Sequence, residues 1–133
     1  MRTRKFAAVA AATAVAAGIA VTGTALPASA ASENGVCEYR EACLHYAGNL
    51  TGSFRDYYSN VPDFAGDTFL SAGSGHGQRV KNNSASVRNL DPYLFARVYY
   101  NENYSGPYDQ VNKNSWRNLV NAWNDNASLQ WVG

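Results

Sequence analysis

Residues 99–106 of the chain read YYNENYSG, and a related stretch, HYAGNLTG, occupies residues 45–52, which lie 54 positions earlier. Each stretch ends in glycine and is followed two residues later by an aromatic residue, Phe54 in the first copy and Tyr108 in the second. Glycine readily adopts the positive φ of a sharply folded turn, and an aromatic side chain that begins the stretch can pack over that turn. We therefore expect one folded β-hairpin in each half of the chain.

A second pair of matched stretches follows the hairpins. Residues 82–87 read NNSASV and residues 124–129 read NDNASL, so each copy has an Asn/Asp pair with a serine three residues after it. The chain thus contains two copies of one ordered pair of elements. This arrangement indicates an internal repeat and two related halves.

The rest of residues 31–133 is typical of an all-β protein. Aromatic and β-branched residues gather in short runs that Gly, Asn, Asp and Pro separate every 8 to 12 residues, as in a sandwich or barrel of short strands. The expected strands cover residues 43–46, 54–58, 69–70, 86–90, 94–100 and 129–132. Residues 115–123 come nearest to a helical period, and a short helical turn there is the alternative. The length suits a single domain with one core.

The first 30 residues have the pattern of a secretory signal peptide. A basic start with Arg2, Arg4 and Lys5 precedes an apolar run over residues 6–26, and a small-x-small cleavage site follows at residues 28–30. We expect cleavage after residue 30 and a secreted protein of residues 31–133. A retained membrane anchor is the alternative, although the run is rich in alanine and therefore weakly hydrophobic.

The composition without the signal peptide narrows the classes of partner. The remaining 103 residues include 8 Lys or Arg and 10 Asp or Glu, which gives a net charge of −2. No basic excess is available to neutralise phosphate groups, so we expect no nucleic-acid partner. After signal cleavage we expect no membrane partner either, and a monomer.

The sequence has two cysteines, Cys37 and Cys43. An exported protein meets oxidising conditions, so we expect a disulfide that holds the first strand. The alternatives are a metal site or a redox pair, but the spacing is not C-x-x-C and no neighbouring Cys or His completes a zinc tetrahedron.

The repeated elements resemble the βγ-crystallin Greek-key motif. The first element of that motif is an aromatic residue, four residues, a second aromatic, any residue and glycine. Tyr99, Tyr104 and Gly106 match it in full, whereas His45 and Leu50 stand at the two aromatic positions of the first copy. The second element, N/D-N/D-x-x-S/T-S, departs from both copies only at its last position. The resemblance implies an all-β Greek-key β-sandwich of two four-stranded motifs.

As a whole, residues 31–133 resemble a secreted actinobacterial peptidase-inhibitor family typified by the Streptomyces metalloproteinase inhibitor. The stretches that carry this resemblance are Cys37–Cys43, Lys81–Asn89, Arg97–Tyr108 and Asn124–Ser128. The resemblance implies inhibition of an extracellular peptidase, in particular a metallopeptidase, through a surface loop. Two other classes remain as alternatives: a calcium-binding or purely structural crystallin-like module, and an extracellular recognition domain that uses exposed Tyr and Trp side chains.

The family's reactive loop indicates a candidate contact segment. In the characterised inhibitor a second disulfide holds this loop, but the present chain has no second cysteine pair. Tyr99 and Tyr104 stand at about the same place and spacing, so an aromatic pair is expected to take over the bracing. The candidate inhibitory loop is Tyr100, Asn101, Glu102 and Asn103, and an ordinary hairpin turn is the alternative.

The two Asn/Asp–Ser elements also suggest a weak calcium site, because they supply hard oxygen ligands. The candidate ligands are Asn82, Asn83 and Ser86 from one half and Asn124, Asp125 and Ser128 from the other. Only Asp125 carries a charge, so an affinity in the range of about 10⁻⁴ to 10⁻³ M is expected. The alternative is that these Asn and Ser residues cap turns. We expect no other cofactor.

The sequence does not indicate an enzyme. Its two histidines are His45, in a strand-like run, and His76, in the glycine-rich segment 71–77, and neither forms a recognisable pair with a nucleophile. The glycine-rich segment lacks the pattern of a phosphate-binding loop, and we expect a mobile connection there. No catalytic residue is assigned.

Overall fold

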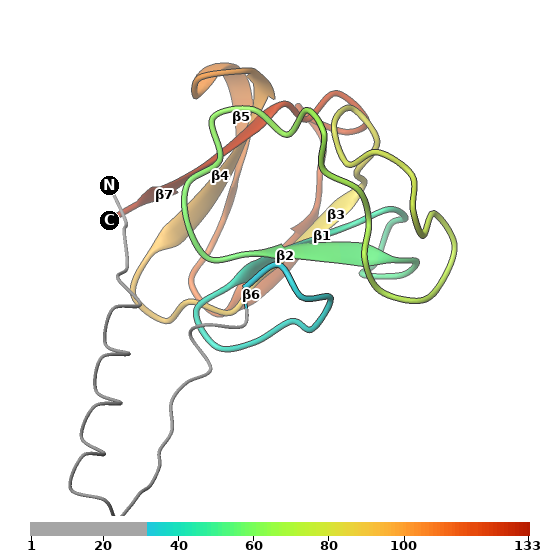
Figure 1. Ribbon diagram of the computed structural model, residues 1–133. Helices are drawn as coiled ribbons and strands as arrows, with labels where there is room; N and C mark the ends of the chain where they lie inside the picture. The colour runs from blue at the N-terminus through green and yellow to red at the C-terminus, as the bar shows by residue number, and fades with distance from the viewer. Residues whose placement is uncertain (1–31) are drawn as a thin grey trace, which may run out of the picture.

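The computed structural model describes residues 32–133, so the predicted signal peptide of residues 1–30 lies outside the described residues (Figure 1). These residues form β-strands and contain no helix. The strands are β1 (Ala42–His45), β2 (Phe54–Tyr57), β3 (Ser86–Asn89), β4 (Phe95–Asn101), β5 (Ser105–Val111), β6 (Ser115–Asn118) and β7 (Ser128–Val132). Accordingly, residues 32–133 contain no helix that is long and apolar enough to cross a membrane.

The strands form two antiparallel sheets with a Greek-key exchange between them. The first sheet has the order β2-β1-β3-β6 and the second the order β5-β4-β7. Strand β6 belongs to the second half of the chain but pairs with β3 of the first half, where Arg117 lies opposite Val87. In the opposite direction, Val61 of the first half of the chain pairs with the second sheet, through an isolated bridge with Leu129 of β7. The predicted all-β Greek-key sandwich is confirmed. Of the eight strands expected for two four-stranded motifs, seven are present, and the bridge at Val61 stands in the place of the eighth.

Three segments differ from the strands expected from the sequence. Residues 69–70 form no strand; Phe69 is buried in the core, and the neighbouring Thr68 makes an isolated bridge with Arg79. Strand β5 was not expected, since its first four residues are exposed and include a proline. Residues 115–118 form β6 and not a helical turn. The loop after β6 is held by the buried Asp109 carboxylate, which accepts hydrogen bonds from the backbone N–H groups of residues 120–122.

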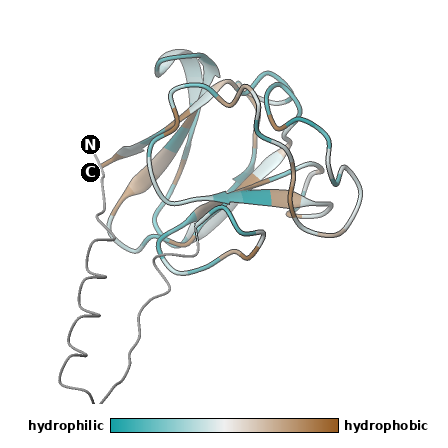
Figure 2. Cartoon of the chain, in the orientation of Figure 1, coloured by the Kyte–Doolittle hydropathy of each residue, from teal (hydrophilic) through white to brown (hydrophobic). Residues whose placement is uncertain are grey.

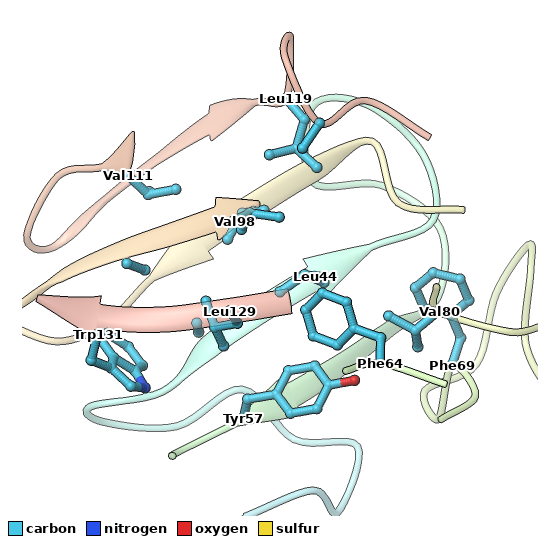
Figure 3. Close-up of a cluster of buried hydrophobic side chains, with 14 residues drawn as sticks. Leu44, Tyr57, Phe64, Phe69, Val80, Val98, Val111, Leu119, Leu129 and Trp131 are labelled. Carbon is cyan, nitrogen blue, oxygen red and sulfur yellow. The ribbon is translucent and has the colours of Figure 1, made fainter. Parts of the chain in front are cut away.

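The hydrophobic core lies between the two sheets and takes side chains from both of them (Figure 3). Leu44 and Val87 come from the first sheet, and Val98, Leu129 and Trp131 from the second; all five are at most 2% exposed. Hydrophilic and hydrophobic residues are mixed along the strands (Figure 2), as expected when only one face of each sheet is buried. Because the halves share one core and exchange strand positions, they form one folding unit.

The disulfide predicted between Cys37 and Cys43 is present, with the two Cα atoms 6.0 Å apart. Cys43 lies opposite Asp56 in the pairing of β1 with β2. The buried carboxylate of Asp56 accepts hydrogen bonds from the backbone N–H groups of Asn34 (3.0 Å) and Gly35 (2.7 Å). Together, the cystine and this carboxylate hold the first described residues against β1 and β2.

Candidate functional site

The two predicted hairpins have the same backbone conformation. Asn49 and Leu50 in the first hairpin have φ of 58°, and Asn103 and Tyr104 in the second have φ of 59°. Gly106 follows with φ of +83°, and a Cβ atom there would lie 2.4 Å from Nδ2 of Asn101. The positive φ favours glycine at this position, and any larger residue would also have to displace the Asn101 side chain.

Each hairpin is locked by a buried serine from the Asn/Asp–Ser element of its own half. In the second half, the Ser128 hydroxyl donates to the carbonyl of Asn101 (2.7 Å) and accepts from the N–H of Tyr104 (3.1 Å). The Ser86 hydroxyl makes the equivalent two hydrogen bonds in the first half, with the carbonyl of residue 47 (2.6 Å) and the N–H of residue 50 (2.9 Å). Both hydroxyl groups thus already act as donor and acceptor within the fold.

The two Asn/Asp–Ser elements also pair with each other. The N–H of Asn82 donates to the carbonyl of Asn126 (2.8 Å), and the N–H of Asn124 donates to the carbonyl of Ser84 (2.9 Å). The buried side-chain amide of Asn126 adds hydrogen bonds to the backbone N–H groups of Asn83 (3.1 Å) and Ser84 (3.0 Å) and to the carbonyl of residue 80 (3.0 Å). Sequence reasoning missed Asn126, because its partners lie more than 40 residues away.

This geometry fits a structural role better than a calcium site. Ser86 and Ser128 are buried and already bonded in the hairpins, so the remaining candidates are Asn82, Asn83, Asn124 and Asp125. The side-chain amide of Asn83 donates to the carbonyl of residue 79 (3.0 Å). Within residues 32–133, no group of three or more His, Cys, Asp or Glu side chains is placed to hold a metal ion. The hydrogen bonds of both serines therefore favour the alternative, in which these Asn and Ser residues cap turns.

The candidate inhibitory loop, residues 100–103, comprises the last two residues of β4 and the first two of its connection to β5, at the top of the molecule (Figure 1). We call these four residues the β4–β5 turn. All four residues are exposed, and Tyr100 is 44% exposed. The ring of Tyr99, which is only 6% exposed, packs edge-on against Tyr104 with the ring centroids 6.2 Å apart. It also lies 5.3 Å from the ring of Tyr108. The aromatic pair therefore supports the turn at its base.

A neighbouring segment holds the β4–β5 turn from the side. The carboxylate of Glu102 pairs with Nζ of Lys81 at 2.5 Å, and the same ammonium group pairs with Asp63 at 2.9 Å. The hydrogen bond from Lys81 lowers the pKa of Glu102. The backbone N–H of Asn103 donates to the carbonyl of Pro62 (2.8 Å). These contacts fix the turn relative to residues 62–63 without a second disulfide.

The two histidines lie in different surroundings. His45 takes the place in the first hairpin that Tyr99 has in the second; it is 8% exposed, and its ring centroid lies 5.0 Å from that of Phe54. Burial lowers the pKa of His45. His76 is exposed, and its Nδ1 atom lies 3.0 Å from the carbonyl oxygen of Ser71. His45 therefore packs as an aromatic residue of the hairpin.

The paired hairpins, each locked by a serine, and the strand exchange between the sheets define a βγ-crystallin-type domain. A chain solved in a study of the evolution of the eye lens βγ-crystallin domain fold superposes with a TM-score of 0.56. It is 17% identical in sequence, and the match covers 84% of the present chain and 93% of the solved one. At this identity the match shows the fold alone.

The chain belongs to peptidase inhibitor family I36, whose sequence profile matches residues 30–111. The matched part contains both hairpins, the cystine and the β4–β5 turn. No curated protein matches the chain. The family is one of inhibitors, so the expectation of a peptidase inhibitor that is not itself an enzyme is confirmed.

Proposed function

We propose that this protein is secreted and inhibits an extracellular metallopeptidase by inserting the β4–β5 turn, residues 100–103, into the substrate cleft. Membership of the inhibitor family supports the activity. The metallopeptidase target rests on the resemblance to the Streptomyces inhibitor. Export is supported by the signal-like residues 1–30 and by the cystine, which is typical of oxidising compartments.

The observation that carries the choice of this turn is its bracing. An inhibitor loop that already has its bound conformation avoids the entropy cost of becoming ordered in the complex. The Ser128 hydroxyl holds the turn from below, the Tyr99–Tyr104 ring contact supports its base, and Lys81 holds Glu102 from the side. In this chain these contacts take the place of the second disulfide.

Two exposed tyrosines provide a matched test of the turn. Tyr100 is 44% exposed in the candidate loop, whereas Tyr39 is 64% exposed in the segment that precedes β1. Purified residues 31–133 and the variants Tyr100→Ala and Tyr39→Ala would be titrated against a thermolysin-like zinc peptidase. A tyrosine anchor of an interface contributes more than about 1 kcal/mol, so Tyr100→Ala should raise Ki by about fivefold or more.

The result for Tyr39→Ala decides how that loss is interpreted. We expect this variant to inhibit as well as the wild type, because residue 39 is not part of the proposed contact segment. If both variants inhibit equally well, the turn is not the contact segment. If both lose inhibition to the same degree, the contact surface is not confined to the turn.

A further inference from the structure

The outer face of the second sheet, β5-β4-β7, adjoins the β4–β5 turn. Buried Ala96, Val98 and Leu129 belong to the opposite face, which packs on the core, so the residues between them lie on the outer face. The outer-face residues are Phe95, Arg97 and Tyr99 of β4, Tyr108 and Gln110 of β5, and Ser128, Gln130 and Val132 of β7. None of them is acidic. The ammonium group of Lys113 adds a second positive charge, 4.9 Å from the ring centroid of Phe95.

The half-buried side chain of Arg97 is held in one orientation on this face. Its guanidinium carbon lies 4.4 Å from the ring centroid of Tyr108, and its Nε–H donates to Oε1 of Gln110 (2.9 Å). The ring of Tyr108 packs in turn on Tyr99, the residue directly before the β4–β5 turn, with the ring centroids 5.3 Å apart. Because the arginine is already oriented, little further conformational freedom is lost when it binds a partner.

The two Nη atoms of Arg97 keep their N–H groups for a ligand. Among residues 32–133, no side chain or backbone group accepts a hydrogen bond from them, and no carboxylate pairs with the guanidinium group. Gln130 lies opposite Arg97 on β7, but its side-chain oxygen accepts from the hydroxyl of Tyr99 instead (2.9 Å). Free Nη atoms present parallel N–H donors in a planar fork, which matches the two oxygens of a carboxylate.

Arg97 lies within reach of a protein that takes up the β4–β5 turn. It stands three positions before Tyr100 on β4, which is about 10 Å along a strand. An interface of ordinary size covers about 800 Å² of each partner, equivalent to a disc of about 16 Å radius. Four turn residues cannot fill this area, so the surfaces beside the turn must contribute. On the other side, the charge of Lys81 is already neutralised by Glu102 and Asp63, whereas the outer face offers an unpaired cation.

We propose that Arg97 binds a carboxylate side chain on the rim of the target peptidase's substrate cleft and so forms a second anchor beside the β4–β5 turn. This inference rests on the proposed function and adds to it the charge of the partner's surface next to the cleft. A carboxylate complements a face that has positive charge and no acidic residue. The net charge of −2 of residues 31–133 disfavours a polyanion such as a nucleic acid as the source of that charge.

The test compares the wild type with Arg97→Gln, with Arg97→Lys and with a matched control, Arg88→Gln. Arg88 is exposed on β3 of the other sheet, and its substitution removes the same charge. All four proteins are titrated against a thermolysin-like zinc peptidase, and thermal unfolding checks that each is folded. We expect Arg97→Gln to raise Ki by about tenfold or more, as for the loss of charge-assisted hydrogen bonds. Arg97→Lys keeps the charge without the fork and should recover only part of the inhibition, and Arg88→Gln should leave Ki unchanged.

A second measurement identifies the carboxylate on the peptidase. Acidic residues on the rim of its cleft are changed one at a time to the corresponding amides, and Ki is measured for the wild-type inhibitor and for Arg97→Gln. One of these changes should weaken the wild type by about tenfold and leave the Ki of Arg97→Gln unchanged, because that variant already lacks the interaction.

The possible outcomes separate this inference from the proposed function. If the wild type inhibits and Arg97→Gln or Arg97→Lys inhibits equally well, or if no rim carboxylate is coupled to Arg97, the inference is overturned while the inhibitory function stands. Equal losses in Arg97→Gln and Arg88→Gln would show a general effect of charge and would overturn it as well. If the wild type does not inhibit the zinc peptidase, the proposed target is overturned, and the inference falls with it.

Discussion

The serine lock beneath the β4–β5 turn gives a prediction whose size can be worked out from the structure. Ser128→Ala removes the hydroxyl that donates to the Asn101 carbonyl and accepts from the Tyr104 N–H. Each buried backbone group left without a partner costs about 1–3 kcal/mol. Because the turn itself is exposed, water can partly replace these hydrogen bonds, and we expect about 2–3 kcal/mol in total. For a domain of this size the melting temperature should fall by about 10–20 °C.

The inhibition measured for Ser128→Ala should fall for a separate reason, namely that the unlocked turn must be ordered on binding. The matched control is Cys37→Ala combined with Cys43→Ala. Loss of this small disulfide loop should cost a similar amount, about 2 kcal/mol, but between β1 and the segment before it, not beneath the turn. Thermal unfolding gives the two stability changes, and Ki is then measured at a temperature where both variants are fully folded.

We expect Ser128→Ala to weaken inhibition and the cystine-free variant to keep it. Equal losses of inhibition in the two variants would mean that general stability matters and the bracing of the turn does not. Unchanged inhibition by a destabilised Ser128→Ala would refute the link between a braced turn and tight binding.

Three further predictions concern other parts of the fold. Burial lowers the pKa of His45, so as the pH falls the unfolded state takes up a proton before the folded state does. The stability of the fold should therefore decrease as the pH drops below about 6.5. In thermal unfolding between pH 7 and pH 5, His45→Phe should remove this decrease. Gly75→Ala should destabilise the fold by about 1–3 kcal/mol in urea unfolding, since its Cβ atom would overlap the Tyr46 ring, and an unchanged midpoint would contradict this packing. Calcium at 10 mM should leave the melting temperature unchanged because both serines are engaged in the hairpins, whereas a site with a Kd of about 1 mM would add about 1.4 kcal/mol.

The parts of the fold that could be predicted from the sequence are those set by local patterns. Tyr99, Tyr104 and Gly106 lie within eight residues, and their spacing alone predicts the folded hairpin that the structure shows. The disulfide followed in the same way from two cysteines separated by five residues. In both cases the interacting residues are neighbours along the chain.

Features that depend on distant partners could not be predicted in this way. Ser128 was recognised in its motif, but its partner Asn101 lies 27 residues away, so the pattern could not distinguish a hairpin lock from a calcium ligand. The Asn126 amide spans 42 and 43 residues to reach its backbone partners. Strand β5 was missed because it lies at the edge of its sheet, where exposed side chains do not alternate with apolar ones.

The glycine-rich loop shows the same limit. Glycines in a sequence indicate freedom of the chain, but here Gly75 is required by the ring of Tyr46, which approaches from 29 residues earlier in the chain. A local pattern therefore predicts flexibility where tertiary packing holds the loop in one conformation.

The central claim is that this crystallin-type domain inhibits a metallopeptidase. The most direct test is a titration of purified residues 31–133 against a thermolysin-like zinc peptidase, with a subtilisin-like serine peptidase assayed in parallel. We expect stoichiometric or near-stoichiometric loss of the zinc peptidase's activity and no effect on the serine peptidase. Full activity of the zinc peptidase at micromolar inhibitor would contradict it.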